Sequence, residues 1–224
     1  MANRQCMSFD GNDDYVKTKS LGALGQNFNA ITAQAWIYFT ADNPNHTRFI
    51  ASVTSNNILF KVNSNRILGL ILIINDVQEG WWNDNYPMTK NTWHHVAFTY
   101  DGAGNGQFYV DRRLTNTFSP SSGYVNAPQG IYIGSHSGAG YKWQGLIDEV
   151  HIYNRALSEA EIKASYLGQT VSRTGLVGEW LFEGNALDTS DETNNGTVYG
   201  ATYQDVPLRV QGIQSITGIQ SITG

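Results

Sequence analysis

Residues 145–162 constrain the fold more than any other part of the sequence. They read GLIDEVHIYNRALSEAEI and begin with apolar and β-branched residues around the acidic pair Asp148–Glu149, as is typical of a β-strand. Ser158 and Glu161 then form a capping box, in which each side chain can satisfy a backbone N–H group of a helix's first turn. The stretch therefore predicts a strand that leads into a short helix.

Four further motifs precede this stretch in a fixed order. They are FDGNDDYV at 9–16, AWIY at 35–38, WHHVAFTYDG at 93–102 and FYVD at 108–111. With residues 145–162, they resemble the laminin-G-like domains of the concanavalin A-like lectin/glucanase jelly-roll family over roughly residues 8–167. One departure is Arg112, which stands where the family usually has glycine. The resemblance implies an all-β fold, an antiparallel β-sandwich of the concanavalin A type (jelly roll) with one short helix in the C-terminal third.

Residues 168–206 resemble an element that this family normally places at its N-terminal end. The motifs GLVGEWLFEGNALD at 175–188 and NNGTVYGATY at 194–203 carry the likeness. Either the domain is circularly permuted, or these strands complete a neighbouring subunit by exchange. We favour permutation within one chain, because domain termini often lie close together. We expect one jelly-roll domain over residues 1–206.

The last residues, 207–224, have a period that fits neither a strand nor an α-helix. Apolar side chains recur at every third position, at Val210, Ile213, Ile216, Ile219 and Ile222. An extended helix with three residues per turn would align them on one side. Three such chains around an axis could bury this stripe, so the segment predicts a homo-oligomer, most simply a trimer. The alternative is a disordered or duplicated tail.

Charge and composition exclude several classes of partner. The net charge is −5 and the sequence has no basic run, which argues against nucleic acid and against anionic membranes. The longest apolar run, residues 67–74, is too short to span a bilayer. Cys6 has no second cysteine to pair with, and the first residues show no signal-peptide pattern. We expect a soluble protein made without a secretory leader.

Catalytic motifs are missing from the sequence. A retaining glycosidase needs two carboxylates about 5 Å apart, and the glucanases of this fold place them on one strand as Glu-x-Asp-x-(x)-Glu. Asp148 and Glu149 are adjacent, so on a strand their side chains point to opposite faces. No Ser-His-Asp order, phosphate-binding loop or zinc-protease motif is present. We predict that the protein is not an enzyme.

Calcium is a candidate structural cofactor. Asp10, Asn12, Asp13 and Asp14 offer hard oxygen ligands close together, and Asp148 stands in the closing strand. The family resemblance implies a cation that ties the opening loop to this strand, with Asp10, Asn12, Asp13 and Asp148 as ligands. The alternative is that these residues form turns through side-chain-to-backbone hydrogen bonds.

Aromatic residues outside the family motifs predict a carbohydrate site. Residues 75–91 read as a long connection, and exposed aromatic residues in loops often mark binding sites. The candidate ligand-binding residues are Trp81, Trp82, Asn83, Asp84, Tyr86 and Tyr141. His136 is a weaker candidate in the loop that holds Tyr141. The alternative is that the tryptophans cover the edge of the sandwich or a subunit interface.

These observations favour a non-catalytic, lectin-like recognition or adhesion module that binds a glycan or another cell-surface ligand. The alternative is a structural decoration or fibre protein of a phage virion, part of a larger capsid or fibre assembly, with no glycan ligand. The two can coexist on the surface of a virion or a cell.

The period-three segment can be tested by truncation. We expect the full chain to be a trimer and a chain ending at residue 206 to be a monomer, because the isoleucine stripe is buried only between copies. Light scattering of both proteins measures this difference. A full chain that is already monomeric would rule out the trimer.

Overall fold

The computed structural model describes residues 4–20, 25–41, 47–52, 57–136 and 141–206 of the chain. These residues contain one helix, α1 (Glu159–Tyr166), and fifteen strands. The strands are β1 (Gln5–Asp10), β2 (Tyr15–Thr18), β3 (Ile31–Phe39), β4 (Thr47–Ser52), β5 (Ile58–Val62), β6 (Leu68–Ile74), β7 (Val77–Asn83), β8 (Trp93–Tyr100), β9 (Gly106–Val110), β10 (Arg113–Phe118), β11 (Ile131–Ile133), β12 (Gln144–Tyr153), β13 (Leu176–Trp180), β14 (Gly196–Tyr199) and β15 (Thr202–Asp205).

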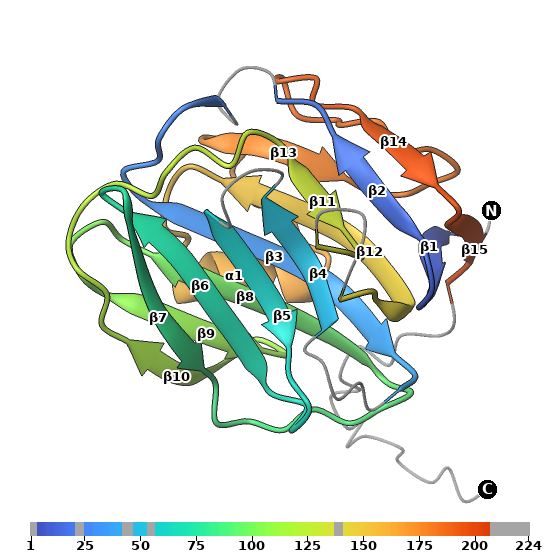
Figure 1. Cartoon of the computed structure of the whole chain (residues 1–224), viewed down its shortest axis with the longest axis horizontal. Coiled ribbons are helices and arrows are strands. Elements are labelled where there is room, and N and C mark those ends of the chain that lie inside the picture. The colour runs from blue at the N-terminus through green and yellow to red at the C-terminus, as the bar shows by residue number, and fades with distance from the viewer. Residues whose placement is uncertain (1–3, 21–24, 42–46, 53–56, 137–140, 207–224) are drawn as a thin grey trace, which may run out of the picture.

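The strands form two antiparallel sheets that pack face to face (Figure 1). Sheet A has the order β10-β9-β8-β3-β12-β1-β15, and β13 also pairs with β12. Sheet B has the order β14-β2-β11-β4-β5-β6-β7. This architecture confirms the predicted antiparallel β-sandwich with one short helix.

The core lies between the sheets and is rich in aromatic side chains. Phe60 of β5 contacts Phe98 of β8 across the two layers, with ring centroids 5.0 Å apart. Phe49 joins Phe60 at 4.5 Å and Trp143 at 5.7 Å. Each of these buried side chains contributes about 1.5–3 kcal/mol through removal of apolar surface from water. The sequence motifs therefore place their alternating apolar residues in one shared core.

The C-terminal segment supplies strands to both sheets of its own chain. Strand β13 pairs with β12, β14 with β2 and β15 with β1. Trp180 of β13 is fully buried and donates its indole N–H to the carbonyl oxygen of Asn194 at 3.2 Å. These pairings complete both sheets within one chain, and permutation as against exchange with a neighbouring subunit stays a prediction. Residues 207–224, with Val210, Ile213, Ile216, Ile219 and Ile222, lie outside the described residues.

Helix α1 covers part of the outer face of sheet A (Figure 1). Its capping box forms as predicted, because Ser158 accepts from the Glu161 N–H and Glu161 accepts from the Ser158 N–H. Hydrogen bonds from Arg155 are the main cause that lowers the pKa of Glu161 to about 2. Tyr166 stacks on Trp36 of β3, with ring centroids 5.4 Å apart. Both faces of sheet A are therefore partly occupied by the chain itself.

The connection expected over residues 75–91 instead contains a strand, which corrects the sequence prediction. Asn75 and Asp76 have φ values of 49° and 66° and form the turn between β6 and β7. A two-residue hairpin turn needs left-handed backbone at both positions, and Asn and Asp tolerate it well. Strand β7 then continues to Asn83 as the edge of sheet B.

No helix in the described part of the chain has the length and apolar character needed to cross a membrane.

Candidate functional site

The two shortest cation–aromatic contacts on the outer face of sheet B involve neighbouring strands. The Lys61 ammonium is 4.1 Å from the centroid of the Trp81 ring, and the Arg48 guanidinium is 4.0 Å from that of Tyr141. Trp81 is 58% exposed and Tyr141 is 44% exposed. We call Arg48, Lys61, Trp81 and Tyr141 the basic site.

Strand register brings the two cations together. Arg48 of β4 lies opposite Lys61 of β5 in the antiparallel pairing. A bulge between Arg48 and Ile50 leaves Phe49 and Ile50 in the core while Arg48 takes the outer face. A bulge alters the alternation of side chains, which is how one strand can send adjacent residues to the core and still present a cation outside.

The side chain of Lys61 passes over a glycine on the next strand. Gly69 of β6 lies opposite Lys61, and a Cβ atom placed on Gly69 would be 2.7 Å from the Lys61 Cε. The lysine stem therefore occupies the space above Gly69 and reaches the ring of Trp81 on β7. Any larger residue at position 69 would displace it.

Both cations of the basic site are buried. Arg48 is 5% exposed and Lys61 is 2% exposed. Next to them, Ala51, Leu59 and Ile71 form a small buried apolar cluster on neighbouring positions of β4, β5 and β6. Burial, reinforced by the charge of Arg48, lowers the pKa of Lys61 to about 8. Burial and the same guanidinium lower the pKa of His136 to about 4, so this neighbour is uncharged at neutral pH.

No carboxylate pairs with these cations among the described residues. Carboxylates of the described residues pair instead with cations such as Arg4, Arg155, Arg173, His94 and His151. The Nε and Nη1 atoms of Arg48 are buried and have no hydrogen-bond partner there. The basic site thus carries positive charge that its described surroundings do not neutralise.

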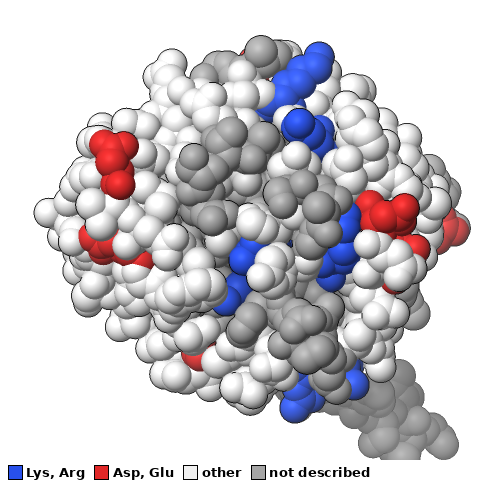
Figure 2. All heavy atoms as spheres, in the orientation of Figure 1, with Lys and Arg blue, Asp and Glu red and all other residues white. Residues whose placement is uncertain are grey.

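A second group of aromatic residues extends across the same sheet. Tyr15 of β2 stacks on Tyr199 of β14, with ring centroids 4.4 Å apart, and Lys142 lies 4.8 Å from the Tyr15 ring. Lys17 lies 5.7 Å from the ring of Tyr132 on β11. Figure 2 shows Lys and Arg atoms along the middle of this face, with Asp and Glu atoms mainly toward its left and right edges.

Some of the residues predicted to bind a ligand are exposed in the structure, and others are buried. Trp81 and Tyr141 both reach the outer face of sheet B, and Asn83 and Tyr86 are exposed near the end of β7. Trp82 points inward instead, 5.0 Å from Phe118 between ring centroids, and packs against the core. Asp84 is fully buried, and burial raises the pKa of its carboxyl. Trp82 and Asp84 therefore fit an interior role, and we leave both out of the site.

Arg48, Lys61 and Gly69 were not among the site residues predicted from the sequence. The signal was a single cation within each of two otherwise apolar strands, RFIAS at 48–52 and ILFKV at 58–62. Such a residue has to face away from the core, but only the register shows that the two cations meet.

The acidic residues near the first strand form a different group from the one predicted. Carboxylate oxygens of Asp10, Asp13 and Asp14 lie within 4.8 Å of one another. Asn12 donates its side-chain and backbone N–H groups to Asp10, at 3.0 and 2.8 Å, so it serves the turn. Three close carboxylates suit Ca²⁺. The Lys142 ammonium, 3.2 Å from the Asp13 carbonyl oxygen, would compete with Ca²⁺ for the negative charge of these carboxylates.

Asp148 does not join this group, which corrects the predicted metal set. Asp10 pairs with Gln144, four positions before Asp148 on β12, and a strand rises about 3.3 Å per residue. Asp148 is fully buried, accepts the Glu149 N–H and lies 3.8 Å from Arg4. Its carboxylate is therefore buried on a central strand of sheet A, beside Arg4 and away from Asp10.

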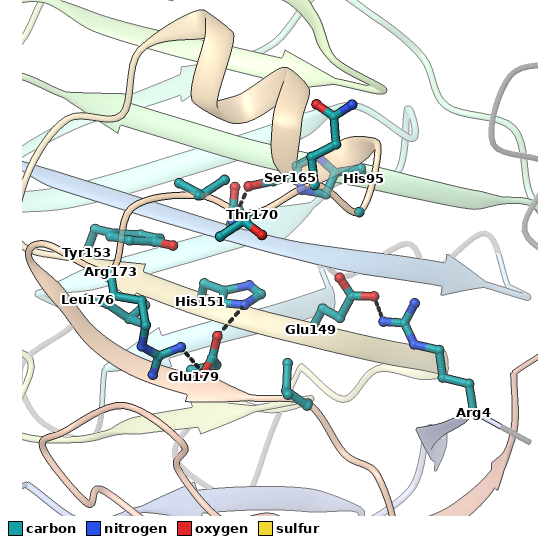
Figure 3. Close-up of a pocket in the computed structure, with 15 residues that line it drawn as sticks. Arg4, His95, Glu149, His151, Tyr153, Ser165, Thr170, Arg173, Leu176 and Glu179 are labelled. Carbon is teal, nitrogen blue, oxygen red and sulfur yellow. Dashed lines mark hydrogen bonds and ion pairs between the residues drawn. The ribbon is translucent and has the colours of Figure 1, made fainter. Parts of the chain in front are cut away.

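A pocket of about 320 Å³ opens on the other side of the molecule, on the outer face of sheet A (Figure 3). Its charges are compensated from within the chain. Glu179 accepts from His151 at 3.2 Å and from Arg173 at 2.8 Å, and Glu149 pairs with Arg4. Burial alone would raise the pKa of Glu179, but hydrogen bonds from His151, Thr189 and Arg173 bring it to about 2. This pocket lacks the unbalanced charge of the basic site.

Comparison with protein families gives one match, which spans most of the sandwich. The family model Laminin_G_3, described as the concanavalin A-like lectin/glucanases superfamily, matches residues 10–163. The chain belongs to this family. A search of curated proteins finds no match to this Laminin_G_3 chain.

Solved structures share the fold of this Laminin_G_3 chain at low sequence identity. A candidate carbohydrate-binding protein from Bacteroides ovatus is 18% identical, with a TM-score of 0.75 over 93% of this chain and 61% of that protein. A heptameric SAP-like pentraxin from Limulus polyphemus is 15% identical, with a TM-score of 0.66 over 91% and 95%. The binding domain of botulinum neurotoxin serotype G is 14% identical, with a TM-score of 0.58 over 73% and 42%. This chain thus spans about three fifths of the Bacteroides protein.

Replacement of Lys61 by methionine tests the buried charge. We expect Lys61→Met to raise the free energy of unfolding by about 2 kcal/mol at pH 6–7, because it removes an unpaired ammonium but keeps an unbranched apolar stem. The pKa of Lys61 falls from 10.5 to about 8 on folding, so the wild-type protein gains stability as pH rises between these values. The advantage of the variant should shrink over the same window.

Urea denaturation of both proteins from pH 6 to pH 10 measures this effect. Lys17→Met is the matched control, because Lys17 is exposed on the same sheet and its removal should give no such gain. A Lys61→Met protein that is no more stable than the wild type at pH 6–7 would contradict the unpaired buried charge.

Calcium binding remains a prediction for Asp10, Asp13 and Asp14. We expect millimolar CaCl₂ to raise the melting temperature and a chelator to lower it, because a ligand bound only by the folded state stabilises that state. Asp13→Asn should abolish the difference, and Asp205→Asn, an exposed change on β15, should preserve it. An unchanged melting temperature with chelator would argue for turn-forming carboxylates alone.

Proposed function

We propose that this chain is a non-catalytic carbohydrate-recognition module that binds its glycan at the basic site on the outer face of sheet B. The observation that carries the proposal is the pair of exposed aromatic rings, Trp81 and Tyr141, each held over a cation on one sheet face. Aromatic rings offer an apolar surface to the C–H face of a sugar, and nearby donors can meet its hydroxyl groups.

The position of the rings supports recognition rather than a core role. Trp81 lies on an edge strand with more than half of its surface in solvent, although its neighbour Trp82 is packed against the core. Its side chain is held by contact with Lys61 and by the bulge at Gly80, where φ is 57°. A large aromatic ring that is both exposed and fixed costs little further entropy when a ligand binds.

Two further points support a binding module without catalysis. The structural neighbour from Bacteroides ovatus is described as a candidate carbohydrate-binding protein. Hydrolysis of a glycosidic bond needs two carboxylates that flank it, about 5–9.5 Å apart. The basic site has cations in place of such a pair among the described residues, and the carboxylates in the sheet A pocket are held by Arg4, His151 and Arg173.

A glycan array tests the proposal. We expect the intact protein to bind a defined set of glycans and Trp81→Ala to reduce that signal at least about tenfold, because the stacking surface is lost. Leu114→Ala is the matched control, since Leu114 is exposed on sheet A, away from the site. Equal binding by wild type and Trp81→Ala would place the site elsewhere. A folded protein that binds no glycan on the array would refute carbohydrate recognition.

A further inference from the structure

We propose that the pocket on the outer face of sheet A is a second ligand site, which takes a neutral polyhydroxy compound of the size of one or two sugar rings. The pocket shares no lining residue with the basic site on sheet B. The inference therefore goes beyond the proposed function and can fail independently of it.

Strand register builds the floor of this pocket. Glu179 of β13 lies opposite His151 of β12, and His151 lies opposite Gln34 of β3. Residues in opposed positions point to the same face, so the three side chains form a row across the outer face of sheet A. Helix α1 continues the row, because the Gln34 Nε2 atom donates to the Ser165 hydroxyl at 3.0 Å.

The segment 168–173 forms one wall and is held at both ends. Next to α1, the Gln169 N–H donates to the Ala164 carbonyl oxygen at 2.9 Å. At the other end, the Arg173 guanidinium donates to Glu179 at 2.8 Å and to the Thr189 carbonyl oxygen at 2.6 Å. The cavity of about 320 Å³ is thus already formed in the free chain, at the small end of the roughly 300–1,000 Å³ typical of ligand sites.

The Tyr153 hydroxyl group is the donor that a ligand would meet. The side chain is 3% exposed and packs with Leu176 in a small apolar cluster, while its hydroxyl group is directed toward the middle of the pocket (Figure 3). Its ring contacts His151 and Arg155, and its hydroxyl group makes no hydrogen bond in the described structure. A buried tyrosine hydroxyl usually has a partner, and an oxygen atom of a ligand can supply one here.

The proton of this hydroxyl group is retained at neutral pH. Burial, reinforced by the negative charge of Glu179, raises the pKa of Tyr153. The group therefore acts as a hydrogen-bond donor and acceptor, which matches the hydroxyl groups of a polyhydroxy ligand.

Polar atoms beneath the floor favour a polar ligand over an apolar one. His151 Nε2 bonds the Glu179 carboxylate and must carry the hydrogen, so Nδ1 is an acceptor in the neutral ring. Gln34 Oε1 is also an acceptor, and neither atom has a partner in the described structure. An apolar ligand would seal both acceptors further from water, at the cost of unsatisfied buried polar groups.

The charges of the pocket favour a neutral ligand. Arg4 pairs with Glu149 at one side and Arg173 with Glu179 at the other, so a charged ligand would have to compete with an existing ion pair. The lining groups that remain available are neutral, such as the side chains of Tyr153 and Thr170. Apolar side chains also line the pocket and can contact the C–H groups of a sugar ring: Val171, Leu176 and Leu181.

Nuclear magnetic resonance of the full chain provides the test. Glucose, galactose, mannose, N-acetylglucosamine, xylose, arabinose, fucose, maltose and lactose would each be titrated to about 50 mM, beside serine as a zwitterion and cyclohexanol as an apolar ring. We expect at least one neutral sugar to shift the amide signals of residues 168–171 with a dissociation constant of about 10 mM or lower. The Trp81 indole N–H signal reports binding at the basic site separately.

Variants test whether the pocket itself binds the sugar. Tyr153→Phe should weaken binding about fivefold or more, because the ligand loses a donor while the ring stays in its apolar cluster. Thr170→Trp should abolish binding, since an exposed change at the pocket lining fills the cavity. Tyr203→Phe is the matched control, because Tyr203 is partly buried on β15 and lines neither site. Melting temperatures of the variants check that each remains folded.

Four results would overturn the inference. Signal changes confined to Trp81 would reject the second site and keep the proposed function. Binding at residues 168–171 that is equally strong in Tyr153→Phe would reject the assigned donor. Tighter binding of serine or cyclohexanol than of every sugar would reject the neutral polyhydroxy ligand. No change at residues 168–171 with any compound would leave the pocket as a structural feature of the fold and refute the site.

Discussion

The pairing of strand β12 holds the sandwich together. Both of its halves pair with β3 on one side, while β1 and β13 pair in succession with its first and second halves on the other. The register shift between Asp148 and His151 separates these halves, and Glu149 has a φ of 47° at that point. One strand thus receives both the start and the end of the domain, so the C-terminal segment is needed to complete sheet A.

Much of the fold could be predicted because its determinants are local. The capping box in the strand-to-helix stretch predicts the start of α1 from residues three apart. The apolar alternation of β4, β5 and β6 likewise predicts each strand from its own residues. The edge strand β7 was missed because its turn, Asn75–Asp76, was read as part of a loop. Trp81 was found as a candidate all the same, since it lies outside the family motifs and is bulky and exposed.

The site depends on register, which the sequence does not display. A net charge of −5 and the absence of a basic run argued against nucleic acid and anionic membranes, but a net charge summed over the chain says nothing about two cations that meet across strands. The same reason explains the metal set: Asp148 is near Asp10 in the family resemblance, yet the pairing of Asp10 with Gln144 places it elsewhere. The two outer faces consequently differ, with charges balanced over sheet A and unbalanced at the basic site on sheet B.

The opposed burial of Arg48 and Lys61 has a consequence for how a ligand can be found. Any anion bound near them would relieve repulsion already present in the free protein, and that gain forms part of its binding free energy. A charged and an uncharged ligand of equal affinity therefore stabilise the folded state equally, because the stabilisation depends only on ligand concentration and dissociation constant. A melting-temperature screen of charged and neutral sugars at equal concentration would then rank them by affinity, before any ligand is known.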